Sequence, residues 1–282
     1  MTLSEVIRQG KVTLESSTAS FGDPTDHMTQ IAEIALGLKR DQIFLCWEDP
    51  LSESDIQKIS ALLKKRLGGE PLQYLSGSAG FWRSSFFVGA GVLIPRPETE
   101  LLIEVLLKES GTGRQKIAEL GAGSGNIGIS TLLERPDWEW WAFEKNPESL
   151  PYVKRNREAL LPPSAAYHLE FGDFFAAAPS HAPFDWIVTN PPYLPSESIP
   201  GLSVEVRHEP RLALDGGSDG LDVIRLLAKT ADFLAKTGSI LMEIAEDQGK
   251  TASEILSSEG FTGIQVFKDR AGLDRVVLAK KG

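Results

Sequence analysis

The segment KIAELGAGSGNIGIS, residues 116–130, decides the fold of this chain. It begins with a short apolar run typical of a buried strand and ends with apolar residues at helical spacing. Between the two, Gly121, Gly123 and Gly125 let the backbone turn tightly and approach a ligand without clashes from Cβ atoms. Free N–H groups of the following helix would face the same ligand. The segment therefore predicts a strand, a ligand-binding loop and a helix in succession.

Strand and helix patterns alternate through the chain from Lys116 onward. Apolar runs rich in Ile, Val, Trp and Phe predict strands at residues 116–120, 138–144, 165–173, 184–190 and 238–244. Helical patterns separate most of them, at residues 125–135, 146–160 and 220–237. We therefore expect an α/β fold with a mainly parallel sheet and helices on both faces. Two further runs predict an antiparallel hairpin at the sheet edge, at residues 261–269 and 274–281.

The region before residue 98 has a different character. The segments DHMTQIAEIALGL and SESDIQKISALLKKRL repeat apolar residues at helical spacing, and Ser52 is a candidate N-cap for the second. The following stretch is rich in glycine, aromatic and β-branched residues, which indicates a hairpin connector. We expect a helical domain that recognises a partner over residues 1–70, a β-hairpin linker over 71–97, and the larger α/β domain over 98–282. A helix with Pro97 in its first turn should open that domain.

Composition narrows the classes of function. The 282 residues carry a formal net charge of −10. A negative net charge disfavours binding to the phosphates of a nucleic acid. Cys46 is the only cysteine and the four histidines are scattered, so we expect no disulfide and no metal site. No signal-type apolar core opens the chain, and no run of about 18 apolar residues occurs. We expect a cytoplasmic protein that does not bind membranes.

Four polar side chains each close a predicted strand: Glu119, Glu144, Asp173 and Asn190. In open α/β sheets, ligands bind at the carboxyl ends of the strands, so we expect these side chains to meet in one site. Glu144 lies about 20 residues beyond the glycines, where an acid can accept both hydroxyls of a ribose. Asp173 followed by Phe174 suits an adenine, because an acceptor can meet its edge and a ring its face.

Two cofactor classes fit the glycine loop. Gly123, Gly125 and Gly128 match the dinucleotide fingerprint G-x-G-x-x-G, in which the loop cradles a pyrophosphate. S-adenosylmethionine has no phosphate and carries a positive sulfonium and an amino group. Glu119 places a carboxylate beside the loop, which is unfavourable next to a pyrophosphate and suits a cationic ligand. This residue favours S-adenosylmethionine.

The segment VTNPPYLPSES, residues 188–198, carries the most specific chemistry. Pro191 and Pro192 have a fixed φ and no N–H, but they keep their carbonyls. Asn190 and Pro191 therefore offer two rigid acceptors for a planar NH₂ group, and Tyr193 can lie against its flat face. Hydrogen bonds from both N–H groups push electron density onto the nitrogen and aim it at a methyl carbon. The pattern indicates methylation of an amide or of an exocyclic amine.

The N-P-P-Y stretch with the upstream E-x-G-x-G-x-G resembles the class I methyltransferases that modify planar amino groups. Three further segments are similar to those of the peptide chain release factor glutamine N5-methyltransferase family: GEPLQYLSG (69–77), GFWRSSFFVGAGVLIPRPETE (80–100) and EVRHEPRLALDGGSDGLD (205–222). The resemblance runs from Gly69 to near the end of the chain. The IPRPETE run favours the release-factor enzymes over their relatives that methylate a ribosomal-protein glutamine.

The resemblance implies a Rossmann-like class I methyltransferase domain with a seven-stranded, mainly parallel sheet, joined through a hairpin linker to a small helical N-terminal domain. It implies methyl transfer from S-adenosylmethionine to the glutamine of the Gly-Gly-Gln loop in class 1 release factors, which would be the protein partner.

Family positions and strand-end positions together assign the site residues. Cofactor contacts are expected from Glu119, Gly121, Ala122, Gly123, Ser124, Gly125, Glu144, Asp173, Phe174 and Asn190. Glutamine contacts are expected from Asn190, Pro191, Pro192 and Tyr193, with Asn190, Pro191 and Tyr193 as the catalytic set. Two positions depart from the family pattern, because Glu144 stands where Asp is commoner and Phe174 where Trp is more usual.

Other function classes stay open at this point. An exocyclic-amine methyltransferase that acts on nucleic acid would need a basic channel, of which the sequence gives no clear sign. A ribosomal-protein glutamine methyltransferase would share most of the motifs. A cofactor-binding scaffold without activity would carry a damaged acceptor motif, whereas Asn190 to Tyr193 are intact.

Overall fold

The chain divides into two compact units in the computed structural model, which describes residues 1–17 and 22–282. One unit comprises Met1–Gly77 and Leu202–His208, and the other comprises Ser78–Gly201 and Glu209–Gly282. The three-part division into a helical domain, a linker and an α/β domain stays a prediction.

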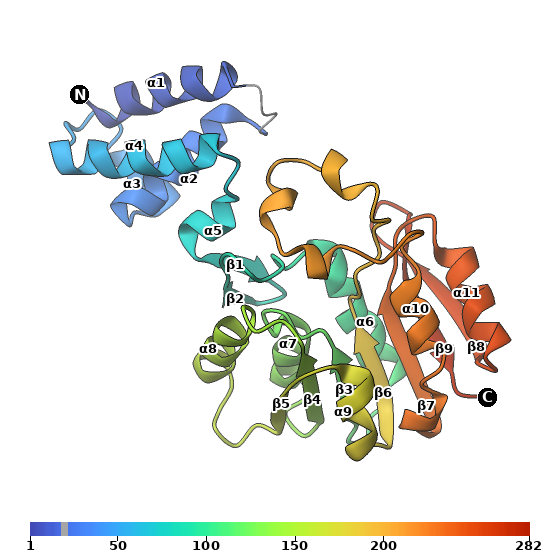
Figure 1. The fold of residues 1–282 in the computed structure, drawn as a ribbon. Coiled ribbons are helices and arrows are strands. Elements are labelled where there is room, and N and C mark those ends of the chain that lie inside the picture. Colours follow the sequence, from blue (N-terminus) through green and yellow to red (C-terminus); the bar gives the residue numbers. More distant parts are fainter. Residues whose placement is uncertain (18–21) are drawn as a thin grey trace. The chain divides into compact units, whose positions relative to one another are not determined.

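Helices build the first unit (Figure 1): α1 Leu3–Glu15, α2 Pro24–Leu36, α3 Arg40–Leu45, α4 Glu53–Leu67 and α5 Leu72–Ser76. Ser52 caps α4, since its side chain accepts a hydrogen bond from the Asp55 N–H, which confirms the predicted N-cap. Helix α5 lies where the sequence predicted only a connector. The helices bury a small apolar core, and its most enclosed side chains include Leu3, Met28, Ile31, Ile43 and Ile59.

A buried arginine ties a distant segment of the chain to this helical unit. Arg66 on α4 is 1% exposed, and its guanidinium pairs with Glu205 in the segment Leu202–His208. The same guanidinium donates to the Glu70 carbonyl oxygen at 3.0 Å. Burial lowers the pKa of Arg66 to about 10, so the side chain stays charged at neutral pH. The ion pair therefore holds the segment in the first unit.

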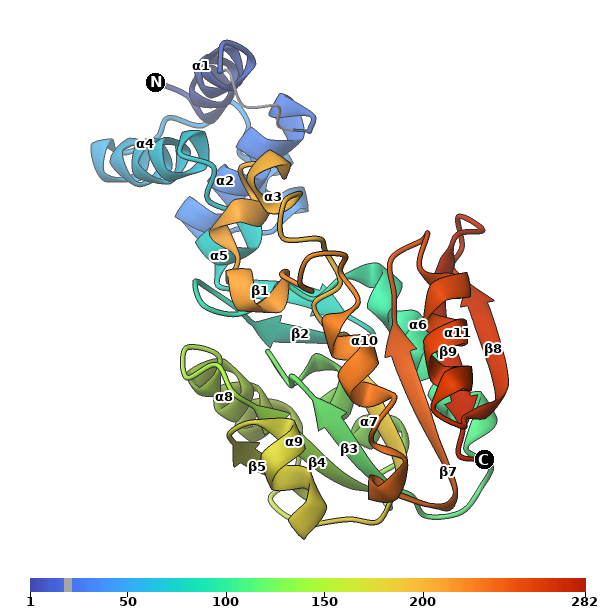
Figure 2. The same ribbon diagram turned by 45° about the vertical axis from the view of Figure 1, so that its right-hand side comes forward.

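The second unit contains a seven-stranded sheet in the order β5-β4-β3-β6-β7-β9-β8 (Figures 1 and 2). Its strands are β3 Lys116–Leu120, β4 Glu139–Glu144, β5 Tyr167–Phe171, β6 Phe184–Thr189, β7 Leu234–Glu243, β8 Thr262–Lys268 and β9 Asp274–Lys280. The first five pair in parallel, and β9 pairs antiparallel with both β7 and β8. This confirms the mainly parallel sheet with a C-terminal antiparallel hairpin. The strand order switches at β3, between β4 and β6, which is where such sheets bind ligands.

Helices cover both faces of this sheet (Figure 2). Apolar residues of α6 Glu100–Glu109, α7 Asn126–Glu134 and α8 Leu150–Leu160 form one core with one side of the strands. Those of α9 Phe174–Ala177, α10 Asp222–Leu227 and α11 Gly249–Ser258 form the other. Along residues 1–17 and 22–282, no helix combines the length and apolarity that crossing a membrane requires.

A separate hairpin precedes α6 in the second unit. Its strands are β1 Ser78–Phe81 and β2 Ser84–Phe87, paired antiparallel. Asn156 on α8 holds it in place, since its side chain accepts from the Phe87 N–H at 2.7 Å and donates to the Phe87 carbonyl at 3.0 Å. The same amide donates to the Ser124 carbonyl at 2.9 Å, so one side chain ties the hairpin to the glycine loop.

The helix predicted over residues 220–237 is wrong in its second half. Helix α10 ends at Leu227, a 3₁₀ turn spans Ala231–Phe233, and Leu234 begins β7. Leu234 is 2% exposed and pairs with Phe184 of β6, so its burial in the sheet overrides a local pattern that also fits a helix. The helix expected from Pro97 likewise begins as a 3₁₀ turn, Pro97–Thr99, before α6.

Gly128 on α7 gives a test of the close packing between this helix and the sheet. A Cβ atom added there would lie 2.3 Å from Nε1 of Trp140, which is fully buried. Alanine gains about 1 kcal/mol of helix propensity over glycine, but overpacking costs about 1–3 kcal/mol. The rigid, fully buried indole places the overpacking cost in the upper part of that range, so we expect Gly128→Ala to lower the free energy of unfolding by a net amount of about 1–2 kcal/mol, measured by urea denaturation. Gly80→Ala is the control, because its added Cβ has no atom within 4 Å. An unchanged or raised stability of Gly128→Ala would contradict the packing argument.

Candidate active site

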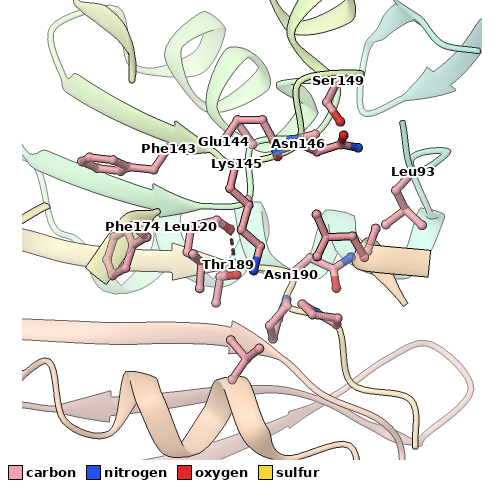
Figure 3. A pocket seen from close by; sticks show the side chains of 18 of the residues that line it. Leu93, Leu120, Phe143, Glu144, Lys145, Asn146, Ser149, Phe174, Thr189 and Asn190 are labelled. Atoms are coloured by element: carbon pink, nitrogen blue, oxygen red, sulfur yellow. Dashed lines mark hydrogen bonds between the residues drawn. The ribbon is translucent and has the colours of Figure 1, made fainter. Parts of the chain in front are cut away.

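One pocket lies at the carboxyl ends of β3, β4 and β6 in the second unit (Figure 3). It brings together most of the residues that the sequence predicted for the site: Gly121, Ala122, Gly123, Ser124, Glu144, Asp173, Phe174, Asn190, Pro191 and Pro192. Glu119, Gly125 and Tyr193 are not among its lining residues. These ten residues therefore lie together at the strand ends, and the other three lie outside the pocket wall.

The glycine loop is held by backbone hydrogen bonds to the neighbouring strand. The N–H groups of Gly121 and Ala122 both donate to the Phe143 carbonyl, at 2.9 and 3.1 Å. Gly125 has φ of 80°, and an added Cβ would lie 2.8 Å from Cδ1 of Ile129. Glycine is required there for conformation and for space, and this turn aims the start of α7 at the pocket.

Glu144 at the end of β4 presents its carboxylate to the pocket. Its two oxygens accept from the N–H groups of Gly123 and Asn146, each at 2.7 Å. Burial raises the pKa of this carboxyl, and the backbone N–H groups oppose that rise. Each carboxylate oxygen has a further lone pair, so the group can accept hydrogen bonds from a ligand as well.

Asp173 and Phe174 follow β5, at the start of α9. Oδ1 of Asp173 caps this helix by accepting from the N–H groups of Phe175 and Ala176, at 2.9 and 3.3 Å. Phe174 is 1% exposed, and its ring meets Phe143 edge-on with centroids 5.2 Å apart. Both rings line the same side of the pocket (Figure 3), which makes an apolar wall.

Glu119 does not face the pocket, which corrects the expectation of a carboxylate beside a cationic ligand. It lies on the same side of β3 as Ile117, because side chains alternate along a strand. There it is fully buried, and Oε2 accepts from the Trp140 indole N–H at 2.7 Å. Burial raises the pKa of Glu119 to about 8, so the side chain is mainly neutral at pH 7.

Asn190 follows the last residue of β6, where it borders the pocket. Its side-chain N–H donates to the Thr99 hydroxyl at 3.0 Å. The preceding Thr189 donates its own hydroxyl to the Leu120 carbonyl at 2.9 Å, the dashed line of Figure 3. Within the described residues, no protein group donates to Oδ1 of Asn190 or to the Pro191 carbonyl. Neither acceptor is therefore engaged by the described residues that surround it.

Tyr193 is anchored behind the pocket by Glu243, a residue that sequence reasoning missed. The Tyr193 hydroxyl donates to Oε1 of Glu243 at 3.2 Å, and its carbonyl accepts from Nε2 of Gln248 at 3.0 Å. Burial raises the pKa of the Tyr193 hydroxyl well above its usual value. Glu243 ends β7 as the other strand-end residues end theirs, so the same pattern could have found it.

The segment before α6 forms another wall that sequence reasoning did not assign. Leu93 and Arg96 line the pocket. The Ile94 N–H donates to Oε2 of Glu209 at 2.9 Å, and Arg96 pairs with Oε1 of the same residue. Lys145 also lines the pocket, and its side chain extends toward Thr189 and Asn190 (Figure 3). The charge of Arg96 is thus matched by a buried carboxylate, whereas Lys145 brings a cation into the pocket.

Two family models match the chain. The one described as the PrmC N-terminal domain matches residues 5–77, and the one described as the methyltransferase small domain matches residues 97–201.

Curated relatives match over most of their length. The release factor glutamine methyltransferase of Neisseria gonorrhoeae is 40% identical over 227 residues, 79% of this chain and 81% of that protein. The protein of the same name from Moorella thermoacetica is 38% identical over 259 residues, 88% and 89% of the two chains. That of Caulobacter vibrioides is 36% identical over 269 residues, 93% and 91%.

Solved structures share the fold at low identity. A methyltransferase from Pyrococcus furiosus has a TM-score of 0.52 at 17% identity, and the match covers 70% of this chain and 88% of that one. The hMettl16 catalytic domain in complex with MAT2A 3'UTR hairpin 6 has a TM-score of 0.53 at 15% identity, with 70% and 74% covered. Likeness at this level shows a class I methyltransferase fold and nothing finer.

Glu119 makes stability depend on pH. A carboxyl with a raised folded pKa keeps a proton that the unfolded chain releases, so stability falls as pH rises from about 4.5 toward 8. In the unmodified protein, Glu119 should lower the free energy of unfolding by up to about 1 kcal/mol for each pH unit of rise. We expect Glu119→Gln, which mimics the neutral acid, to remove this dependence. Urea unfolding between about pH 5 and pH 8 measures it. Glu158→Gln, at an exposed position on α8, should leave the slope unchanged. An equal slope in Glu119→Gln and the unmodified protein would contradict the assignment.

Proposed function

The chain belongs to the release factor glutamine methyltransferase family, and from that membership we propose its reaction. It transfers a methyl group from S-adenosylmethionine to the side-chain amide nitrogen, N5, of the glutamine in the Gly-Gly-Gln loop of class 1 peptide chain release factors. The observation that carries this proposal is the pair of available acceptors at one pocket, Oδ1 of Asn190 and the Pro191 carbonyl.

The donor groups of the pocket fit S-adenosylmethionine better than a dinucleotide. The Gly123 N–H, which a pyrophosphate would need, already donates to the Glu144 carboxylate. Glu144 keeps lone pairs for ribose hydroxyls, and Phe174 with Phe143 offers an apolar wall to an adenine. The loop from Gly121 to Gly125 would pass beneath the amino-acid end of the cofactor. When bound, S-adenosylmethionine supplies a methyl group activated by the positive sulfonium.

The acceptor pair suits the substrate amide. A primary amide has two N–H donors in one plane, and Asn190 and Pro191 can each accept one of them. These bonds orient the nitrogen and raise its electron density, which offsets the delocalisation that makes an amide a poor nucleophile. As the new N–C bond forms, the S–CH₃ bond of the cofactor would break and S-adenosylhomocysteine would leave. The nitrogen would then release its extra proton to water, so no general base is required before attack. Pro192 stiffens the turn that carries both acceptors.

The substrate class follows from the family and from the neutral acceptors. Family relatives carry the name of a release factor enzyme, and a neutral amide needs no basic channel. The direct test incubates the purified protein with a release factor and labelled S-adenosylmethionine, and locates the methyl group by mass spectrometry. We expect the label on the glutamine of the Gly-Gly-Gln loop. Label on a nucleic acid or on a ribosomal protein, with none on the release factor, would reject the proposal.

Asn190→Ala tests the acceptor role in the same assay. Loss of one preorganised polar group at a reacting centre costs about 100-fold or more in turnover, so we expect kcat to fall by at least about 100-fold. The Kd of S-adenosylmethionine, measured by calorimetry, should change much less, because the loop and Glu144 remain. Glu197→Ala, at an exposed position in the same segment, is the control and should keep kcat. Turnover near the unmodified level in Asn190→Ala would exclude the acceptor mechanism.

The helical unit is proposed to capture the release factor, and its exposed apolar side chains are the means. Phe44 is 60% exposed and stacks on Trp47, and the adjacent Leu45 is 86% exposed. Exposed apolar groups that lie together favour a protein partner. We expect the double variant Phe44→Ser, Leu45→Ser to raise the KM for the intact release factor about 10-fold, with kcat and cofactor affinity unchanged.

The control variant for release factor binding changes a residue of the same helical unit. Val12 on α1 is also 60% exposed, so Val12→Ser removes an exposed apolar side chain elsewhere on the unit. It should leave the KM for the release factor unchanged. Equal KM values for the double variant and the unmodified protein would show that this surface does not bind the release factor.

A further inference from the structure

A buried carboxylate at the end of β7 stands behind the acceptor motif. Glu243 is 1% exposed and lies in the second unit. Its two oxygens accept from two hydroxyls, Oε2 from Thr99 at 2.6 Å and Oε1 from Tyr193 at 3.2 Å. Thr99 in turn accepts from the side-chain N–H of Asn190 at 3.0 Å. One carboxylate thus connects to both ends of the N-P-P-Y stretch.

The direction of these hydrogen bonds is determined by their donors. An ionised carboxylate only accepts, so Thr99 must give its single hydroxyl proton to Glu243. The Thr99 oxygen can then only accept from Asn190, which places the NH₂ end of that amide toward Thr99. The oxygen of Asn190 is left for the pocket. The two ends of an amide are nearly equal in shape, so packing cannot make this choice and the hydrogen-bond chain does.

We propose that Glu243 is a positioning residue that sets the orientation of the Asn190 amide through Thr99. With Glu243 ionised, the alternative orientation would bring the Asn190 oxygen against the Thr99 oxygen, and neither would have a proton to give. Glu243 also anchors the far end of the motif through the Tyr193 hydroxyl. It does not touch the substrate glutamine, and its role rests on the proposed function, in which the Asn190 oxygen receives a substrate N–H.

The surroundings of Glu243 place its titration near neutral pH. Burial raises its pKa to about 7, while hydrogen bonds from Thr99 and Tyr193 and the positive charge of Arg275 on β9 lower it. Glu98, in the turn before α6, raises it further. Arg275 is itself paired with Asp269. A protonated Glu243 can donate to Thr99 and release the amide from its single orientation, so kcat should fall as the pH drops below about 7.

Three variants test the role against the proposed release factor substrate. Glu243→Gln keeps the shape but lets its NH₂ donate to Thr99, and Thr99→Val keeps the shape without a hydroxyl. We expect both to lower kcat about 10- to 100-fold, with less than about 3-fold change in KM and in cofactor Kd. Thr99→Ser keeps the hydroxyl, so its kcat should stay within about 3-fold of that of the unmodified protein. The fall of kcat below about pH 7 should be absent in Glu243→Gln.

Several results would overturn the inference. These are an unchanged kcat in Glu243→Gln and Thr99→Val, an equal loss in Thr99→Ser, or a change confined to KM. Melting temperatures separate these effects from unfolding, and Glu243→Gln carries the test if Thr99→Val does not fold.

A second readout is independent of turnover and separates this inference from the proposed function. The side-chain NH₂ signal of Asn190 in ¹⁵N NMR spectra should shift in Glu243→Gln and Thr99→Val and stay in place in Thr99→Ser. If the unmodified protein methylates no release factor, the proposed function fails and this signal still decides the orientation. A signal that is identical in all four proteins would reject the positioning role.

Discussion

Hydrogen bonds between the carboxyl ends of three neighbouring strands hold the candidate site together. The Phe143 carbonyl on β4 accepts from the N–H groups of Gly121 and Ala122, which follow β3. The Thr189 hydroxyl on β6 donates to the Leu120 carbonyl on β3. Both contacts require β3 to lie between β4 and β6, as the sheet order has it. The loop, the pocket and the position of Asn190 therefore depend on one register across three strands.

Three buried carboxyls lie on strands of the sheet near this edge, and each meets a different kind of hydrogen-bond donor. Glu119 meets an indole N–H, Glu144 meets two backbone N–H groups, and Glu243 meets two hydroxyls. Burial raises the pKa of all three. Of the three, Glu144 is the one that lines the pocket. Buried carboxyls weaken a fold at neutral pH, and their concentration at one edge is typical of a functional site.

Much of the fold could be predicted because buried parallel strands are short apolar runs with glycine or polar residues after them. The five parallel strands and the terminal hairpin were found in this way. The error over residues 220–237 has the same origin. A buried strand start and an amphipathic helix end look alike locally, and only the contact of Leu234 with Phe184 distinguishes them. Helix α5, five residues long, is too short for a periodic pattern.

The sequence by itself determined the strand–loop–helix unit and the rigid acceptor turn, because glycine and proline act on the backbone where they stand. It also determined that Glu144 and Asn190 would reach one edge, since parallel strands end together. Only the tertiary structure decided which side chains face the pocket. Glu119 turns toward Trp140 because side chains alternate along β3. Glu243 acts on Asn190 through Thr99, a residue 144 positions away in the chain, and a contact of that range leaves no local pattern to read.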